Sequence, residues 1–172
     1  VGVLTTLAGA GTRIVSDALN HASIVDGCRL ARGDLVVTPH GDVEAVDRAL
    51  AADDRPAVVV TDSVFSMDGD TADVARLAEV CARRGALLVL DEAHAVLGPE
   101  PDLPAGLEVV RVGTLSKALG SLGGFVACSS AVRDLLVNAA RPFIFTTALS
   151  PADAGAALAA VDVMRSAEGA AL

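Results

Sequence analysis

Short apolar runs alternate with amphipathic stretches along almost the whole chain. The runs are rich in Val, Leu and Ile, as expected for strands that are buried on both faces. They span residues 14–15, 35–37, 57–60, 86–90 and 109–112, and a further run at 124–128 predicts an antiparallel or edge strand. Between the runs lie helix-like stretches at 21–30, 42–50, 70–84, 131–139 and from 151 onward. Repeated strand–helix units joined by short turns predict an α/β fold with a mostly parallel sheet flanked by helices.

Helix boundaries are marked by capping residues. The clearest helix has apolar residues at i, i+3, i+4 and i+7 from Val74 to Cys81. Asp70 or Thr71 is the predicted N-cap, and Gly85 is predicted to end the helix after two arginines. Asp42 and Ser150 are predicted to cap two other helices, the second with a proline at its first position.

Composition and charge narrow the class of protein. Hydrophobic residues make up 52% of the chain and the mean hydropathy is +0.54, which excludes disorder. Polar residues interrupt each apolar run well before the length of a membrane span. A net charge of −9 without a basic stripe argues against nucleic acid as a partner. Three cysteines without CxxC spacing indicate reduced thiols in a cytoplasmic protein and no metal site.

The candidate catalytic residues follow the ends of two predicted strands. Lys117 lies after the strand at 109–112, near Thr114, and is the only lysine in an arginine-dominated chain. Lysine in such a setting suggests an amine that must lose its proton. Asp91 and His94 follow the strand at 86–90. A lysine able to form an imine, an aspartate for a ring nitrogen and hydroxyls for a phosphate are what pyridoxal phosphate (PLP) requires.

Other interpretations of these residues exist. The letters Asp-Glu-Ala-His at 91–94 also occur in helicases, but the chain has no GxxxxGK[ST] phosphate loop. Asp91 could cap a turn and His94 could bond to backbone, although a buried strand-end carboxylate is costly without a cation. By themselves, His21 and His40 are more typical of loop and turn histidines. Ser66 lies beyond another strand end, where its hydroxyl would face the same crevice.

Five motifs in order carry a resemblance to a known family. They are Ser-Asp-Ala-Leu-Asn-His-Ala-Ser (16–23), Val-Phe-Ser-Met-Asp-Gly-Asp (64–70), Asp-Glu-Ala-His (91–94), Gly-Thr-Leu-Ser-Lys (113–117) and Pro-Phe-Ile-Phe-Thr-Thr-Ala-Leu-Ser-Pro (142–151). Together they resemble the α-oxoamine synthases, which are fold-type I PLP enzymes with an aspartate aminotransferase-like large domain. These acyltransferases condense an amino acid with an acyl thioester and release carbon dioxide.

The resemblance implies a role for each matching residue. Lys117 would hold PLP as an imine, and Asp91 would pair with the pyridine nitrogen. His94 and Ser66 would interact with the phenolic oxygen, and His21 would stack on the ring. The residues implied in phosphate binding are Thr114 and, across a homodimer, Thr146 or Thr147 of the partner.

The resemblance also implies which substrates are used and which part of the family's chain residues 1–172 represent. The Leu-Ser-Lys form and the segment Phe-Thr-Thr-Ala-Leu-Ser-Pro favour the member that joins L-alanine to a pimeloyl thioester of coenzyme A or a carrier protein, for biotin synthesis. Glycine-using members, taking acetyl or succinyl thioesters, and a truncated non-catalytic fragment are the alternatives. Residues 1–172 would be the central part of the PLP-binding large domain, without the amino-terminal segment and the small carboxy-terminal domain, and inactive in isolation. The continuation Ala-Val-Leu at 95–97 and the short loop before Val109 depart from the family pattern.

Overall fold

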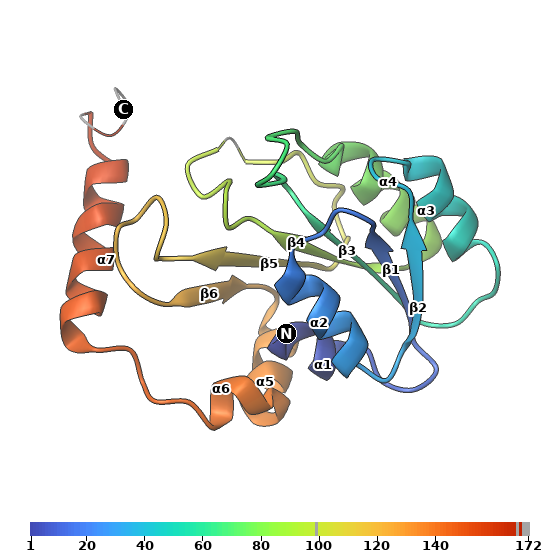
Figure 1. The fold of residues 1–172 in the computed structure, drawn as a ribbon, viewed down its shortest axis with the longest axis horizontal. Coiled ribbons are helices and arrows are strands. Elements are labelled where there is room, and N and C mark those ends of the chain that lie inside the picture. The colour runs from blue at the N-terminus through green and yellow to red at the C-terminus, as the bar shows by residue number, and fades with distance from the viewer. Residues whose placement is uncertain (99, 168, 170–172) are drawn as a thin grey trace.

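The fold is a twisted six-stranded sheet with helices on both faces (Figure 1). The structure is a computed structural model that describes residues 1–98, 100–167 and 169. Its strands are β1 (Arg13–Asp17), β2 (Asp34–Thr38), β3 (Ala57–Asp62), β4 (Leu87–Asp91), β5 (Val109–Thr114) and β6 (Gly124–Ala127). Its helices are α1 (Gly2–Leu7), α2 (Ala22–Leu30), α3 (Val43–Leu50), α4 (Val74–Arg84), α5 (Ser130–Ala139), α6 (Arg141–Ile144) and α7 (Pro151–Met164).

The strand order is β2-β1-β3-β4-β5-β6. The first five strands pair in parallel, and β6 pairs antiparallel with β5. The predicted α/β class and the predicted antiparallel strand at 124–128 are therefore confirmed. Because parallel strands share one direction, the carboxyl ends of β1 to β5 lie along one edge of the sheet. The candidate catalytic residues lie at that edge.

Each face of the sheet has its own hydrophobic core because side chains alternate along a strand. On one face Val58 and Val60 of β3 pack in a cluster with α1, α2 and α5. On the other face Val59 packs in a cluster with α3 and α4. Leu88 of β4 is 0% exposed, and Cys81 belongs to the same cluster, as predicted for an apolar helix position. The sheet edge is thus built on a scaffold packed from both sides.

The predicted caps at Asp42, Ser150 and Gly85 are confirmed, whereas the predicted start of α4 is not. Asp42 accepts a hydrogen bond from the Ala45 amide, and Ser150 accepts one from Asp153. Gly85 ends α4 in the left-handed region at φ 66°. The prediction of Asp70 or Thr71 as the α4 cap is wrong.

Asp73 is the N-cap of α4, and it accepts a bond from the Arg76 amide at 3.1 Å. The two residues predicted for this role are engaged elsewhere. Thr71 forms an isolated bridge with Val64, and Asp70 bonds to His40. Because of these long-range contacts, the helix begins later in the chain than the sequence predicts.

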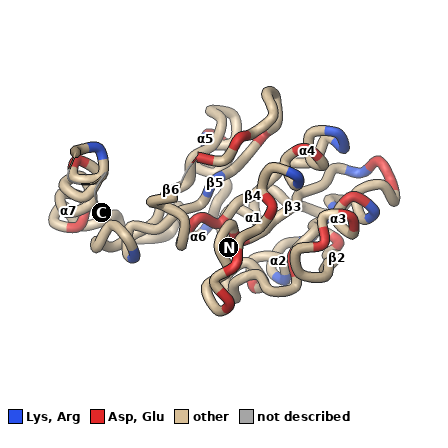
Figure 2. Tube along the Cα trace, turned by 90° about the horizontal axis from the view of Figure 1, so that it is seen from above, with Lys and Arg blue, Asp and Glu red and all other residues tan. Residues whose placement is uncertain are grey.

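Charged residues are intermixed on the helices far from β6 (Figure 2). Arg84 of α4 bonds to Asp47 of α3 at 2.7 Å and holds the pKa of that carboxyl below its usual range. Arg76 of α4 pairs with Glu44 of α3 in the same way. These exposed pairs add little stability each, but they place cations beside carboxylates instead of in a basic stripe.

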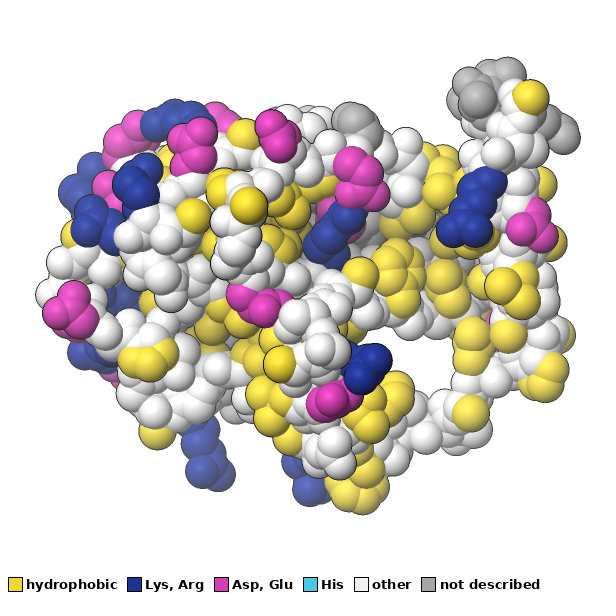
Figure 3. Space-filling model, turned by 180° about the vertical axis from the view of Figure 1, so that it is seen from behind, with side chains coloured by type: hydrophobic (Ala, Val, Ile, Leu, Met, Phe, Trp, Pro, Cys, Tyr) yellow, Lys and Arg dark blue, Asp and Glu magenta, His cyan; other side chains and the backbone are white. Residues whose placement is uncertain are grey.

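The last helix stands apart from the sheet body. α7 extends beyond β6, and Ala157 is its buried residue (Figure 1). Its side chains Leu158, Val163 and Met164 are exposed, and hydrophobic side chains line the neighbouring surface (Figure 3). α6 lies within a segment for which the sequence analysis proposed no helix. Among the described residues, no helix is long and apolar enough to cross a membrane.

Candidate active site

The carboxyl ends of neighbouring strands bring several polar residues to one edge. Asp62 ends β3 and Asp91 ends β4, and the two are register partners. Thr114 ends β5, the next strand along. Residues that are distant in sequence therefore meet because their strands are adjacent and parallel.

Lys117 is placed by the loop that joins β5 to β6. It is the only lysine in the sequence. Its Nζ lies 2.7 Å from Nε2 of His94, which follows β4. Together with Ser63 these side chains line an open cavity of about 490 Å³. The structure therefore brings together the amine and the imidazole that the motifs single out.

The loop around Lys117 is rich in hydroxyl contacts. Thr114 Oγ1 lies 2.7 Å from Ser116 Oγ and accepts a hydrogen bond from the Ser116 amide at 3.2 Å. Thr114 Oγ1 also donates to the Gly123 carbonyl at 3.1 Å. Hydroxyls and amides gathered just beyond a strand are suited to bind an anion such as phosphate.

Asp91 faces a second cavity and also stabilises a turn. Its Oδ1 accepts a hydrogen bond from the Ala93 amide at 3.0 Å, so the alternative role as a turn cap is real. The same residue lines a cavity of about 580 Å³ together with Ser23, Gly113 and Thr146. A turn bond at one oxygen is compatible with a ligand at the other, since a carboxylate has about four acceptor positions. His94 contacts Lys117, whereas the alternative interpretation had it bonded to backbone.

His21 is held at the start of α2. It is the N-cap residue, and its Nδ1 accepts a hydrogen bond from the Ser23 amide at 3.2 Å. Its own amide donates to Asp62 Oδ2 at 2.6 Å. The histidine that sequence alone would leave in a loop is therefore tied to the end of β3.

Asp62 is a site residue that the sequence analysis missed. It is 5% exposed, and burial raises the pKa of its carboxyl, as does the nearby Asp91. Its amide donates to the side chain of buried Asn20, which in turn donates to the Val60 carbonyl. The signal was present in the sequence, because Asp62 follows a buried strand just as Asp91 does.

The remaining candidates are less closely assembled. Ser66 lies exposed in the loop after β3, and Thr147 lies exposed after α6. Thr146 lines the cavity that contains Asp91. In the part of the chain that the structure describes, no hydrogen bond links these three residues to Lys117, His94 or Asp91.

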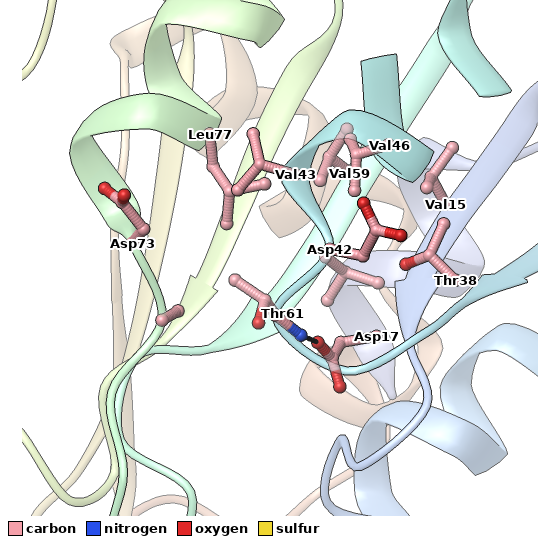
Figure 4. Close-up of a pocket in the computed structure, with 13 residues that line it drawn as sticks. Val15, Asp17, Thr38, Asp42, Val43, Val46, Val59, Thr61, Asp73 and Leu77 are labelled. Atoms are coloured by element: carbon pink, nitrogen blue, oxygen red, sulfur yellow. Dashed lines mark hydrogen bonds between the residues drawn. The ribbon is translucent and has the colours of Figure 1, made fainter. Parts of the chain in front are cut away.

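Two of the cavities are of the size that binds small molecules, for which about 300–1,000 Å³ is usual. A third, between the sheet and α3 and α4, measures only about 20 Å³ (Figure 4). Lys117 and His94 line one of the two larger cavities, and Asp91 lines the other.

The fold and the residues at this edge are typical of one class of protein, and the sequence matches a family of that class. The family model described as "Aminotransferase class I and II" matches residues 1–171. The chain belongs to this family.

Particular relatives share a common name. The chain is 54% identical to the 8-amino-7-oxononanoate synthase of Mycolicibacterium gilvum over 95% of its length, and it covers 46% of that protein. It is 53% identical to the enzyme of the same name from Mycobacterium tuberculosis strain F11, covering 45% of it. The chain thus spans less than half the length of the curated relatives it matches.

Solved structures show the same fold. A structure described as SPT with the PLP internal aldimine has a TM-score of 0.89 and 33% identity, and the match covers 96% of this chain and 44% of that one. The 8-amino-7-oxononanoate synthase of Francisella tularensis has a TM-score of 0.78 and 26% identity, covering 98% and 51%. Both matches extend over nearly all of this chain, which confirms the predicted fold-type I architecture.

Proposed function

We propose that the full-length protein is a PLP-dependent 8-amino-7-oxononanoate synthase. It condenses L-alanine with a pimeloyl thioester and releases carbon dioxide. The observation that carries the proposal is the contact between Lys117 and His94 at the carboxyl edge of a parallel sheet. Names of relatives at 54% and 53% identity support the particular reaction.

The chemistry of the side chains at the edge supports the assignment of PLP as the cofactor. An amine that can form an imine is present once, at Lys117, and it opens into a cavity of about 490 Å³. A carboxylate able to pair with a protonated ring nitrogen is present at Asp91, which lines the larger cavity. Thr114 and Ser116 supply hydroxyls for a phosphate. When bound, PLP supplies an electron sink for the negative charge that develops at the substrate α-carbon.

Each residue then has a defined task in holding the cofactor. Lys117 would attach it covalently, and Asp91 would keep a proton on the pyridine nitrogen. His94 and Ser66 would hydrogen-bond to the phenolic oxygen, and His21 would pack against the ring. Thr114, together with Thr146 or Thr147 of a partner subunit, would bind the phosphate.

Lys117 is also the group that moves a proton. Its amine, once neutral, removes the α-proton of the amino acid, for which it must lie within hydrogen-bond reach of that carbon. His94 at 2.7 Å fixes the position of the amine in the structure. The α-carbon then attacks the thioester carbonyl and expels the thiolate, which takes a proton from solvent. The carboxylate next leaves as carbon dioxide, and return of the proton from Lys117 to the α-carbon completes the condensation.

The phosphate role of Thr146 or Thr147 requires a homodimer. Support comes from exposed apolar residues in the segment that precedes and contains them, namely Phe143, Ile144, Phe145 and Leu149. Large exposed apolar groups gathered in one segment mark surfaces that another part of a protein covers.

Substrate assays on the full-length enzyme test the proposed reaction. Alanine and glycine are each combined with pimeloyl, acetyl and succinyl thioesters, and product formation is measured as kcat/KM. We expect alanine with the pimeloyl thioester to be preferred. One methyl group in a pocket gives only about 10–200-fold discrimination, so the preference over glycine falls in that range. A preference for glycine with an acetyl or succinyl thioester would show that the protein catalyses the reaction of a glycine-using member of the family instead.

A further inference from the structure

The side chain of His40 bridges two carboxylates. Its Nδ1 lies 2.9 Å from Asp17 Oδ1, and its Nε2 lies 2.6 Å from Asp70 Oδ2. A neutral imidazole has one N–H donor and one lone pair, whereas ionised carboxylates only accept. Both contacts are therefore hydrogen bonds only when both ring nitrogens carry a proton. With both carboxylates ionised, the geometry fits an imidazolium, although sequence analysis assigned His40 to a simple turn.

The surroundings of the ring support that charge state. His40 packs edge-on against buried Phe65, with ring centroids 4.5 Å apart and an interplanar angle of 85°. The charged groups that face it are Asp17 from the end of β1 and Asp70 from the loop between β3 and α4. The hydrogen bond with Asp17, followed by that with Asp70, raises the pKa of His40.

Asp17 organises the turn that leads to His21. Its Oδ1 also accepts a bond from the Leu19 amide at 2.8 Å, and its Oδ2 accepts one from the Gly41 amide at 2.9 Å. The Gly41 bond is the dashed line beside Asp17 in Figure 4. One carboxylate thus connects the turn before α2 to the turn that carries His40.

Asp70 closes the loop that carries Ser66. Its carbonyl accepts a bond from the Phe65 amide at 2.9 Å, and the Phe65 carbonyl accepts one from Gly69 at 2.9 Å. Ser66 lies between these closing contacts. Asp17, His40 and Asp70, here called the His40 clasp, therefore join the segment of His21 to the loop of Ser66.

We propose that His40 is a positioning residue that, as an imidazolium, fixes the Ser66 loop relative to the His21 turn. The functional role of this positioning rests on the proposed function, because His21 and Ser66 are the residues that the proposal assigns to the cofactor ring. The clasp is complete below the usual histidine pKa of ~6.5 and is lost as the pH rises through the raised pKa. Loss of the proton leaves one carboxylate facing a lone pair, so the loop is released.

Backbone hydrogen exchange of the full-length protein tests the clasp without reference to turnover. The amides of Phe65 and Gly69 report closure of the loop, and their exchange is followed against pH after correction for intrinsic rates. In the wild type we expect protection to fall by about tenfold or more above the His40 pKa, since hydrogen bonds to charged groups are the strong ones. His40→Gln carries its N–H donors on a single nitrogen and has an acceptor as its other polar atom, so it cannot replace both ring donors and should show the low protection at every pH.

A second variant separates the charge argument from a general loss of structure. In Asp70→Asn the amide can either donate to a neutral ring or accept from a protonated one. The loop should therefore stay protected and the pH step should disappear. Asp68→Asn, an exposed change in the same loop, is the matched control and should retain the wild-type step.

Several results would overturn the clasp. These are unchanged protection in His40→Gln, a pH step that persists in Asp70→Asn, or a His40 ring that titrates at its usual pKa by NMR. The PLP band of the holoenzyme completes the test, because its pH dependence should follow that of the loop. A clasp that behaves as expected in a protein without synthase activity would refute the proposed reaction alone.

Discussion

Replacement of Asp91 by asparagine isolates the charge at the end of β4. The wild-type carboxylate accepts a hydrogen bond from the Ala93 amide at 3.0 Å and lines the cavity of about 580 Å³. Asparagine has nearly the same shape and keeps an oxygen that can accept the Ala93 bond. Asp91→Asn should therefore preserve the turn and the fold while it removes the negative charge from the cavity.

The size of the effect follows from electrostatics. Opposite unit charges about 3 Å apart in an effective dielectric of about 20 attract each other by roughly 5 kcal/mol. Part of this attraction is offset by the desolvation of the carboxylate. A remaining loss of about 3–4 kcal/mol corresponds to a fall in kcat of about 10²–10³-fold, the usual range for lost transition-state electrostatics.

The assay uses the full-length enzyme with saturating alanine and pimeloyl thioester. Asp73→Asn is the matched control, because Asp73 caps α4 outside the site and asparagine caps helices equally well. Both variants should keep the wild-type melting temperature and bound cofactor, but only Asp91→Asn should lose turnover. Near-normal turnover by a folded, PLP-loaded Asp91→Asn enzyme would show that Asp91 serves the turn alone.

Three further outcomes are expected. Borohydride should trap PLP on Lys117 in the wild type, and Lys117→Ala should abolish both the adduct and turnover; peptide mapping to another lysine of the full-length protein would contradict the assignment. Residues 1–172 expressed alone should show no synthase turnover, because catalysis by proximity needs the substrate enclosed on all sides; measurable product would refute this. Burial raises the pKa of Cys81 to about 12, so at neutral pH thiol reagents should label the partly exposed Cys128 well before Cys81 in the folded protein. Equal labelling rates at Cys81 and Cys128 would show that the core between the sheet, α3 and α4 opens readily.

Local patterns were sufficient to predict the strands and most helix ends. Each depends on hydrophobic periodicity or on a capping residue within a few positions. The α4 cap could not be predicted this way, because the engagement of Asp70 depends on His40, thirty residues earlier in the chain. Asp62 was within reach, since the rule that identified Asp91 applies to it equally.

The roles of His40 and of the 141–151 segment required three-dimensional contacts. Nothing in Pro39-His40-Gly41 distinguishes a turn histidine from one that bridges two carboxylates. α6 is a four-residue helix with no buried residue, so it leaves no periodic signal. The phosphate role assigned to Thr146 and Thr147 stays a prediction.

The antiparallel pairing of β5 with β6 determines how freely Lys117 can move. Residues 115–123 form a short loop whose ends are joined where Thr114 pairs with Gly124. Inside it the Leu115 amide donates to Gly123, Ser121 to Leu115, and Gly120 to Lys117. A chain segment closed this tightly has already lost most of its conformational entropy during folding. The covalent capture of a ligand that we propose for Lys117 would therefore require little additional ordering of the backbone, and insertions into this loop should weaken capture even where they leave every side chain of the site intact.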